Sequence, residues 1–432
     1  MPTKPEATGA RRRAEHAETL VAMRDLRVHY ALRGSTLARL FGRDVGTVKA
    51  VDGVDLEIAK GEVLGLVGES GSGKSTLGRA VLGLAPITEG SIAYEDTRIE
   101  NLSSRRLREI RRDLQMIFQD PNAALNPAMD METAVGHPLK IHKLARGEEL
   151  RRRVIDALER VGLSPAGLFM KKYPSDLSGG QKQRAVIARS LILDPVLLIA
   201  DEPISMLDMS VRSKILQLML DLKADLDLTY IYITHDLASA KFFCDRIAIM
   251  YLGRVVEIGD TEEIFADPKH PYTQSLVGAI PDMDPDRAEP RDLPRGEIPD
   301  AASPPLGCAF HPRCPKAFDR CGWESRDLRI LLETHWTKVP ESKYDAERAI
   351  VGDIDALDVP SHTSVLPAGG GHTGADVQRV LDTIQADDPA EPLWKGVRDR
   401  RVTGSGVEVD FHEGEDPKLR PAGGVEVACH LY

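Results

Sequence analysis

The chain has no long hydrophobic run, no sustained heptad repeat and only five cysteines, and each absence narrows what it can be. No window offers the ~18–20 continuous apolar residues that a membrane-spanning helix needs. The longest apolar run, Leu191 to Ala200, is interrupted by Asp194 and Pro195. We therefore expect another chain to do any membrane crossing. Five cysteines without a visible secretory signal favour metal or redox chemistry over a disulfide framework.

Basic residues are in the minority, with 56 Lys and Arg against 67 Asp and Glu and a net charge of −11. Proteins whose main partner is nucleic acid usually carry basic stripes, so we expect no nucleic-acid partner. Simple solubility accounts for the acidity. Residues 1–20 are polar, and Arg11–Arg13 is followed by no apolar stretch, which predicts a mobile tail, with lipid contact as the alternative.

The pattern divides the chain into an α/β domain at 21–280 and a C-terminal extension at 281–432. Three short apolar runs predict buried strands: Val63–Val67, Val196–Ala200 and Tyr230–Thr234. Two further runs flank Gly253 and predict a hairpin: Ile247–Tyr251 and Arg254–Ile258. Polar, Arg-rich segments at 101–112 and 146–160 predict exposed helices. In the extension, residues 326–412 suggest a partly flexible insertion.

A glycine-rich loop follows the first predicted strand and precedes a predicted helix from Lys74 to Leu84. Glycines at this place let backbone N–H groups turn inward and cradle phosphate oxygens. Lys74 can reach the β- and γ-phosphates, and the Ser75 hydroxyl can ligate Mg²⁺. The predicted phosphate-binding set is Gly68, Ser70, Gly71, Ser72, Gly73, Lys74, Ser75 and Thr76.

Two carboxylates end the apolar run at Val196–Ala200. Asp201 suits a water-mediated hold on Mg²⁺, and Glu202 is placed to polarise an attacking water. Acidic pairs after apolar runs are common, so this pair alone predicts little. It indicates a magnesium and hydrolysis site because a phosphate loop precedes it in the chain.

A second motif lies about a hundred residues after the first and reads Leu177-Ser178-Gly179-Gly180-Gln181. Its hydroxyl, its N–H groups and the dipole of a helix beginning near Gln181 favour a γ-phosphate. With Lys182–Arg184 and Asp201–Pro203, the motif resembles the ATP-binding cassette (ABC) ATPases. The resemblance implies a RecA-like P-loop core of α/β class with an antiparallel β-subdomain and an α-helical subdomain. It also implies that ATP is sandwiched between two such cassettes.

The resemblance assigns further roles one residue at a time. Gln119 would touch Mg²⁺ and water and sense the membrane partner, His235 would contact the γ-phosphate, and Asp208 would lie in the loop that crosses the dimer interface. Tyr30 would stack on adenine, although an insertion at 31–48 follows it. The implied catalytic residues are Glu202, His235 and Gln119, and the implied Mg²⁺ ligands are Ser75, Gln119 and Asp201. Ile204 and Met206 depart from the small residues usual in the Asp208 loop.

Several stretches are similar to the oligopeptide/dipeptide importer ATPases, and the Asn-Ala-Ala-Leu-Asn sequence within Phe118–Pro127 leans toward their F-type subunit. The other stretches are His270–Thr273, Tyr173–Ser175, Met250–Gly253 and Gly307–Pro315. This resemblance covers about 21–323 and resumes at roughly 413–432. It implies a heterodimer with a sister ATPase, two permease chains, an extracytoplasmic substrate-binding protein and a peripheral place on the cytoplasmic face of the membrane. Residues of about 100–175 would receive the permease coupling helices.

Four cysteines mark the C-terminal extension: Cys308, Cys314, Cys321 and Cys429. Four thiols suit either Zn²⁺ or an iron–sulfur cluster. The spacing lacks the C-x₂-C pairs typical of zinc ribbons. The resemblance implies a [4Fe–4S] cluster, with zinc and no metal as alternatives, and the insertion before Cys429 is longer than the family usually has. The fifth, Cys244, lies in an apolar context and is expected to be a buried core thiol.

Other functional classes are weighed on the same features. Soluble ABC proteins of translation or DNA repair usually carry two cassettes or a long coiled coil, and this chain has one phosphate loop and no sustained heptads. The His270–Thr273 and cysteine segments argue against an exporter. Nickel or glycoside import stays open beside peptide import, because an ATPase subunit does not contact the cargo.

Overall fold

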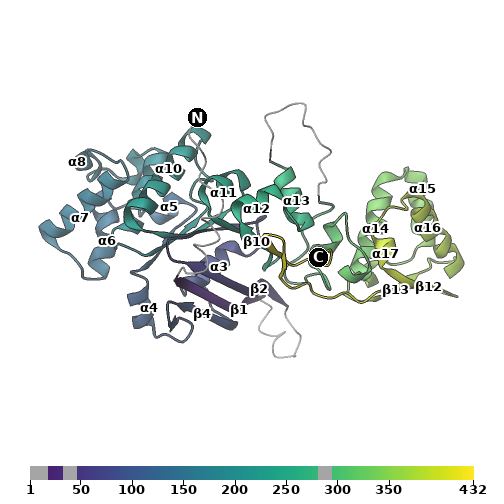
Figure 1. The fold of residues 1–432 in the computed structure, drawn as a ribbon. Helices are drawn as coiled ribbons and strands as arrows, with labels where there is room; N and C mark the ends of the chain where they lie inside the picture. Colours follow the sequence, from purple (N-terminus) through teal and green to yellow (C-terminus); the bar gives the residue numbers. More distant parts are fainter. Residues whose placement is uncertain (1–17, 33–45, 281–293) are drawn as a thin grey trace, which may run out of the picture. The chain divides into compact units, whose positions relative to one another are not determined.

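The computed structural model describes residues 18–32, 46–280 and 294–432. The predicted N-terminal tail up to residue 17, most of the insertion after Tyr30 and residues 281–293 lie outside the described residues. The chain forms two compact units, Met1–Phe265 and Ala266–Tyr432 (Figure 1). Each unit is described by itself below.

A mixed sheet forms the centre of the first unit, with the strand order β10-β9-β3-β8-β7-β6. Its strands are β3 (Val63–Val67), β6 (Leu114–Ile117), β7 (Leu197–Asp201), β8 (Thr229–Thr234), β9 (Arg246–Tyr251) and β10 (Arg254–Asp260). The five strands from β9 to β6 run parallel, and β10 pairs antiparallel with β9. All five residues of β3 and all six of β8 are buried, as expected for parallel strands covered on both faces.

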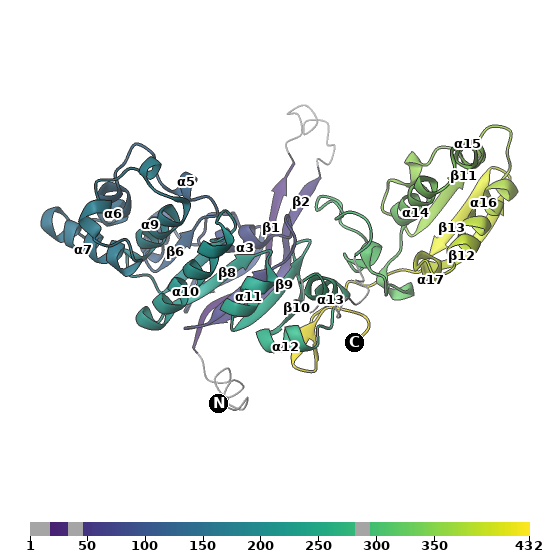
Figure 2. The same cartoon turned by 90° about the horizontal axis from the view of Figure 1, so that it is seen from above.

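Helices on the two faces of this sheet account for that burial. On one face, a Cβ added to Gly78 of α3 (Lys74–Val81) would lie 2.9 Å from Ile233 and 3.0 Å from Ile199. On the other face, the ring of Phe243 in α11 (Leu237–Phe243) lies 4.9 Å from the ring of Tyr232. Alternate residues of β8 therefore pack against different helices, and Figure 2 shows α11 against the sheet.

A second sheet of the first unit is antiparallel, in the order β2-β1-β4-β5. Its strands are β1 (Thr19–Ala31), β2 (Thr47–Ala59), β4 (Glu89–Tyr94) and β5 (Thr97–Arg98). Helix α3 contacts strands of both sheets. The phosphate loop that precedes α3 is thereby held between two layers of strands.

The remaining helices of the first unit include a group, α5 to α9, that packs together. The helices are α4 (Ser104–Ile110), α5 (Pro121–Ala124), α6 (Met131–Ile141), α7 (Gly147–Arg160), α8 (Ala166–Phe169), α9 (Gly179–Leu191), α10 (Met209–Leu226) and α12 (Thr261–Ala266). Among the described residues, none of the helices is both long enough and apolar enough to cross a bilayer. The RecA-like core with an antiparallel β-subdomain and a helical group is the ABC ATPase fold expected from the sequence.

Most predicted elements of the first unit are confirmed, with small shifts at their ends. The three apolar runs form β3, β7 and β8, and the two runs around Gly253 form the β9–β10 hairpin. The Arg-rich segments form α4 and α7. The helix expected near Gln181 begins two residues earlier, at Gly179, because Ser178 supplies its N-terminal cap.

The second unit begins with α13 (Pro271–Gly278), which the sequence division had grouped with the first domain. Residues 326–412 form a folded domain instead of a flexible insertion. Its helices are α14 (Ser325–Lys338), α15 (Glu341–Ile350), α16 (Gly374–Asp387) and α17 (Leu393–Gly396). They accompany a sheet in the order β11-β13-β12, from β11 (Thr363–Pro367), β12 (Val397–Thr403) and β13 (Gly406–Phe411).

This domain has a small core of its own, which explains why it folds. Val377, Leu381 and Ile384 recur along one face of α16 and are buried, as are Val409 and Phe411 of β13. The 3.6-residue period of α16 and the alternation along β13 were present in the sequence. The glycines and mixed charges that surround these elements mask both patterns in the sequence. A short hairpin of β14 (Arg420–Ala422) and β15 (Val425–Val427) follows the domain.

Candidate nucleotide-binding and hydrolysis site

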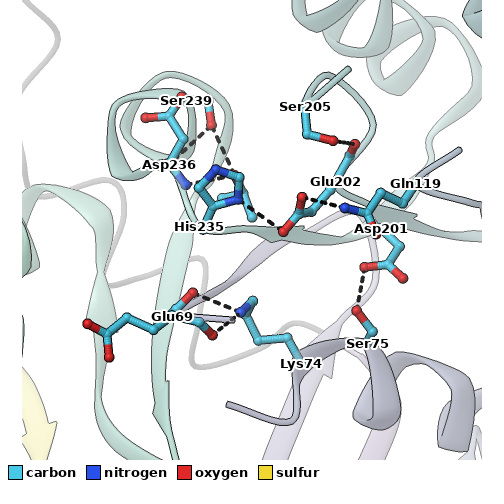
Figure 3. A network of polar contacts seen from close by, with 12 residues as sticks. Glu69, Lys74, Ser75, Gln119, Asp201, Glu202, Ser205, His235, Asp236 and Ser239 are labelled. Atoms are coloured by element: carbon cyan, nitrogen blue, oxygen red, sulfur yellow. Dashed lines mark hydrogen bonds and ion pairs between the residues drawn. The ribbon is translucent and has the colours of Figure 1, made fainter. Parts of the chain in front are cut away.

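The phosphate loop runs from the end of β3 to the start of α3 and carries a buried lysine. The Lys74 ammonium donates to the carbonyl oxygens of Gly68 (2.8 Å) and Glu69 (2.7 Å) and to the hydroxyl of Ser72 (3.2 Å), as Figure 3 shows for Glu69. Burial lowers the pKa of Lys74, and the nearby carboxylates of Glu202 and Asp201 act in the opposite direction. The side chain therefore lies inside the loop at the place where phosphate oxygens are expected.

Gly73 is one of the loop glycines that the surrounding backbone requires. Gly73 caps α3 with φ of 99°, and a Cβ built there would lie 2.0 Å from the carbonyl oxygen of Ala50. Both the positive φ and this close approach exclude other residues. Gly71 also has a positive φ, of 81°, but a Cβ there would meet nothing within 4 Å.

The Ser75 hydroxyl and Asp201 are held together across two elements. Ser75 lies in the first turn of α3, and its Oγ donates to Oδ1 of Asp201 at the end of β7, at 2.7 Å. Burial raises the pKa of Asp201, while the Ser75 hydrogen bond lowers it. A hydroxyl and a carboxylate at this separation form a ready oxygen donor set for a small hard cation such as Mg²⁺.

Glu202 stands at the centre of the site, with a donor on each carboxylate oxygen. Gln119 Nε2 donates to Oε2 at 2.9 Å, and His235 Nδ1 lies 3.0 Å from Oε1 (Figure 3). Because a carboxylate only accepts, the imidazole presents an N–H at Nδ1. Three predicted residues from separate elements thus meet at one carboxylate: Gln119 after β6, Glu202 after β7 and His235 after β8.

The backbone of Glu202 is itself unusual, with φ of 46°. Left-handed backbone in a residue other than glycine is costly and persists only where the surroundings impose it. Here the Glu202 N–H donates to the carbonyl of Ile233, and the Ser205 hydroxyl donates to the Glu202 carbonyl at 3.1 Å. The turn directs the Glu202 side chain toward Gln119 and His235.

A supporting group behind His235 was not anticipated from the sequence. Asp236 caps α11 by accepting from the N–H of Ala238 at 2.9 Å, and Ser239 donates to the Asp236 carbonyl at 2.8 Å. These contacts hold the turn that carries His235. An Asp directly before an apolar helix is an N-cap signal that could have identified Asp236, whereas Ser205 and Ser239 carried no signal.

The signature residues form a separate site. Ser178 Oγ accepts from the N–H of Gln181 at 3.4 Å, and Gln181 Oε1 accepts from the N–H of Ser178 at 3.0 Å, a reciprocal cap at the start of α9. A cavity of about 270 Å³ is lined by Ser178, Gly179, Gly180 and Gln181 together with Asp208. Within the described chain, no hydrogen bond or ion pair joins this group to Lys74, Ser75 or Glu202.

The other predicted residues lie as follows. Tyr30 is near the end of β1 and is 40% exposed. Leu177, which directly precedes Ser178, is buried. Ser70 is exposed on the loop, and Thr76 is on α3. Lys182, which follows the signature, donates to Asn122 Oδ1 at 2.9 Å and so ties α9 to the segment after Gln119.

The C-terminal cysteines of the second unit influence one another electrostatically. Burial raises the pKa of the Cys308 thiol, and the thiols of Cys321, Cys314 and Cys429 raise it further. Burial likewise raises the pKa of Cys314 to about 12 and that of Cys321 to about 11. Among the described residues, no three His, Cys, Asp or Glu side chains are grouped closely enough to hold a single metal ion.

A long sequence separation does not keep Cys429 from the other three, because the chain returns to its starting point. A Cβ built on Gly414 would lie 2.0 Å from Cα of Gly322, and the N–H of Glu415 donates to the carbonyl of Arg320 at 3.3 Å. The two ends of the folded domain therefore meet the cysteine segment at the same place. Cys244, by contrast, is a buried core thiol packed against Gly65, as expected.

Segments of the chain match two known protein families. Residues 51–205 match the family described as ABC transporter, and residues 256–321 match the family described as oligopeptide/dipeptide transporter, C-terminal region. The chain is 41% identical over 326 residues to the oligopeptide transport ATP-binding protein AppF of Bacillus subtilis, and the match covers 75% of this chain and 97% of the relative. It is 43% identical over 311 residues to the oligopeptide transport ATP-binding protein OppF of Salmonella typhimurium, covering 71% and 92%.

Among solved structures, the chain is similar to a dimeric ATP-binding cassette in a post-hydrolysis state bound to ADP and Pi. The sequences are 31% identical, the TM-score is 0.49, and the match covers 56% of this chain and 98% of the other.

Proposed function

The chain belongs to the ATP-binding subunits of ABC oligopeptide/dipeptide importers, and from that premise we propose that the residues gathered around Glu202 hydrolyse ATP to drive peptide uptake through partner permeases. The observation that carries the proposal is the meeting of Gln119, Glu202 and His235 beside the Lys74 loop and the Ser75–Asp201 pair. Phosphoryl transfer needs a positioned base, a cationic clamp and a metal-binding oxygen pair, and all three are present.

The chemistry assigns one task to each side chain. Glu202 accepts a proton from the attacking water as the water oxygen bonds to the γ-phosphorus, and the bond from that phosphorus to the β–γ bridging oxygen breaks to release ADP. Lys74 exchanges its loop carbonyls for β- and γ-phosphate oxygens and stabilises the charge that develops on them. His235 exchanges Glu202 for the γ-phosphate as the partner of its Nδ1–H, and Gln119 orients the water. Ser75 and Asp201, with Gln119, would hold Mg²⁺, which supplies charge neutralisation at the phosphates when bound.

The signature residues would serve the ATP of a second cassette. Ser178 and the N-terminal N–H groups of α9 line an open cavity together with Asp208, and they are not bonded to the phosphate loop of their own chain. A helix N-terminus with a hydroxyl cap suits a γ-phosphate oxygen. We propose a sister ATPase as the second cassette, so that the two chains clamp ATP as a heterodimer.

A groove beside the site suits a permease. It has a volume of about 160 Å³ and is lined by Leu84, Met116, Phe118 and Pro138 among others. Leu84 and Phe118 are 49% and 36% exposed, and Phe118 directly precedes Gln119. An apolar permease helix seated here would move Gln119 and thereby the water at Glu202. We propose that two permease chains hold the subunit at the cytoplasmic face, and that an extracytoplasmic binding protein delivers the cargo.

The four cysteines of the second unit would hold a [4Fe–4S] cluster. They are the ligand set that such a cluster takes, and the Cys308 thiol interacts electrostatically with the other three. When bound, the cluster would supply a redox-active centre or a structural staple.

An anaerobic preparation tests the cluster. We expect a brown protein with absorbance near ~400 nm, as thiolate-ligated iron gives, and we expect Cys321→Ser to remove that absorbance. The control Cys244→Ser, which alters the cysteine outside the set, should keep it. A colourless anaerobic protein with stoichiometric zinc would overturn the cluster in favour of a zinc site.

Uptake of a labelled tripeptide tests the transport function. In cells lacking this chain, the wild type should restore uptake, and so should Glu262→Gln, which changes an exposed acid of α12. Glu202→Gln should not. If cells that lack the chain take up the tripeptide as well as rescued cells do, and no other peptide system is present, the peptide cargo is wrong. Labelled nickel and glycosides then become the cargoes to measure.

A further inference from the structure

The domain inserted between Cys321 and Cys429 contains a cavity that the transport mechanism does not use. The similarity to the importer C-terminal region ends at Cys321, and the Bacillus subtilis relative is almost fully covered by three quarters of this chain. The cavity has a volume of about 380 Å³. That value lies at the lower end of the range of about 300–1,000 Å³ for ligand pockets, which suits a ligand of amino-acid or dipeptide size.

An apolar surface lines much of the cavity. Its apolar residues come from the cysteine segment, from α14, from the end of α16 and from α17: Pro312, Trp323, Ile330, Leu331, Ile384 and Leu393. Trp323, Ile384 and Leu393 are buried, whereas Ile330 is 49% exposed at the rim. Such a lining favours a ligand with an apolar side chain.

Most charges around the cavity already have partners within the second unit. Arg295 pairs with Glu391 at 2.5 Å, and Asp327 accepts from the buried ring of His311 at 2.9 Å. The other two pairs are Asp387 with Lys343 at 3.2 Å and His335 with Glu347 at 2.9 Å. Five of the residues in these four pairs line the cavity, and they are occupied in holding the domain together.

Two lining charges of opposite sign are left over. Lys338 lies at the last residue of α14, and Asp388 directly follows α16. Neither side chain forms a hydrogen bond or ion pair with any residue in the described ranges, and both are exposed at the rim. One cation and one anion above an apolar floor match a molecule that carries an ammonium, a carboxylate and an apolar side chain.

We propose that this cavity binds a small zwitterion with an apolar side chain, either a free α-amino acid or a dipeptide. Asp388 faces the ammonium, Lys338 faces the carboxylate, and the side chain packs on the apolar lining. The site is distinct from the ATP site and belongs to a different unit. A ligand bound in this cavity would let the second unit respond to the class of molecule that the transporter handles. Only this link to the cargo rests on the proposed function.

A ligand bound in the cavity would restrain the cysteine segment. Pro312 and Trp323 line the cavity, the first within that segment and the second just after it. The Asp327 carboxylate accepts from His311, whose other ring nitrogen donates to the Cys308 carbonyl at 2.8 Å. A ligand that restrains α14 would restrain this chain of contacts. Hydrogen exchange of the amides at 308–321 should then slow when the ligand is added.

Tryptophan fluorescence gives a direct binding measurement on the purified full chain. All three tryptophans of the protein lie in this domain, at positions 323, 336 and 394, and Trp323 lines the cavity. We expect leucyl-leucine or leucine to change the emission saturably, with half-saturation at about 0.1–1 mM for ligands of this size. Whichever of the two binds more tightly shows whether the cavity takes a dipeptide or a free amino acid.

Matched ligands and variants decide whether the two charges are recognised. Wild type should bind leucyl-leucine about two- to fivefold more tightly than N-acetyl-leucyl-leucine or leucyl-leucine amide, as expected for exposed charge pairs. Asp388→Asn should lose only the preference for the free amine, and Lys338→Met only the preference for the free carboxylate. The controls Asp345→Asn and Lys395→Met, exposed residues outside the lining, should keep both preferences.

Three results would overturn the proposal. These are the absence of a saturable change up to about 10 mM ligand, equal binding of the capped peptides by wild type, and equal weakening of all ligands in both variants. None of these results bears on ATP hydrolysis, because the measurement needs neither nucleotide nor partner chains. The proposed function would stand or fall on the uptake experiment alone.

Discussion

At the scale of single residues, one carboxylate organises the hydrolysis site. Glu202 adopts a left-handed backbone, and its two oxygens are held by Gln119 and His235. Because these partners follow different strands, each can move with its own element. The arrangement suits a base whose orientation depends on events at the permease groove and at the γ-phosphate.

Replacing Glu202 by Gln should slow ATP hydrolysis by about 100-fold or more, the usual contribution of a general base. An amide cannot accept the water proton, but it keeps the size of the side chain. ATP affinity should change little, because Lys74 and Ser75 are untouched. Phosphate release by the assembled transporter and binding of a fluorescent ATP analogue measure the two effects. Near-normal turnover would contradict the assignment of Glu202, and Glu262→Gln is the control.

At the scale of elements, the N-terminus of α9 combines a structural and a functional role in one hydroxyl. Ser178 caps the helix, and the same group faces the cavity assigned to the second ATP. Helix stability and phosphate binding should therefore respond differently to different substitutions at this position.

Two substitutions of Ser178 separate these roles. Ser178→Ala removes the cap and should lower the free energy of unfolding by about 1 kcal/mol. Ser178→Asp keeps an equally good cap, so stability should stay within about 0.5 kcal/mol. Its carboxylate would repel the γ-phosphate and should abolish ATP-dependent association with the sister subunit. Urea unfolding and size-exclusion chromatography are the measurements. An active Ser178→Asp variant would exclude the phosphate role.

The phosphate loop offers a matched pair of glycines. Gly73→Ala should lower the free energy of unfolding by at least about 2 kcal/mol, because a strained φ is combined with a clash on the Ala50 carbonyl. Gly71→Ala has a positive φ but open space, so its cost should be about 1 kcal/mol. Thermal unfolding of both variants without nucleotide tests the difference. Equal losses of unfolding free energy in the two variants would mean that the clash with the Ala50 carbonyl does not destabilise the protein.

At the scale of the whole molecule, a domain is inserted into the cysteine segment without separating its ends. Gly322 and Gly414 are in contact, so the chain continues from one to the other almost as if the domain were absent. Domain insertions are tolerated where the two ends of the insert lie close together. This arrangement explains how Cys429 influences Cys308 across more than a hundred residues.

Replacing residues 323–413 by two glycines should leave ATP affinity within about twofold of the wild type, because the nucleotide residues belong to the other unit. The excision removes Asp327 and leaves the buried His311 ring without its acceptor, at a cost of about 1–3 kcal/mol. Asp327→Leu in the full chain removes the same acceptor while keeping the rest of the domain. Nucleotide titration and calorimetric melting measure the two effects, and loss of ATP affinity would contradict the independence of the site.

The candidate hydrolysis residues could be predicted because their motifs are local. Lys74 and Ser75 follow a strand and a glycine loop, and Asp201 and Glu202 end another strand, so parallel pairing alone brings them to one edge of the sheet. The supporting hydroxyls of Ser205 and Ser239 could not be predicted. Their role depends on backbone turns that neither composition nor spacing specifies.

The sequence by itself determined the cassette, its strands and its motif residues, because these rest on periodicities and spacings within about ten residues. Only the tertiary structure decided three other features. They are the folded state of 326–412, the return of the chain at Gly322 and Gly414, and the placing of Lys338 and Asp388 at one cavity. Each of these depends on packing between residues far apart in the chain, where small differences between large opposing energies select the arrangement.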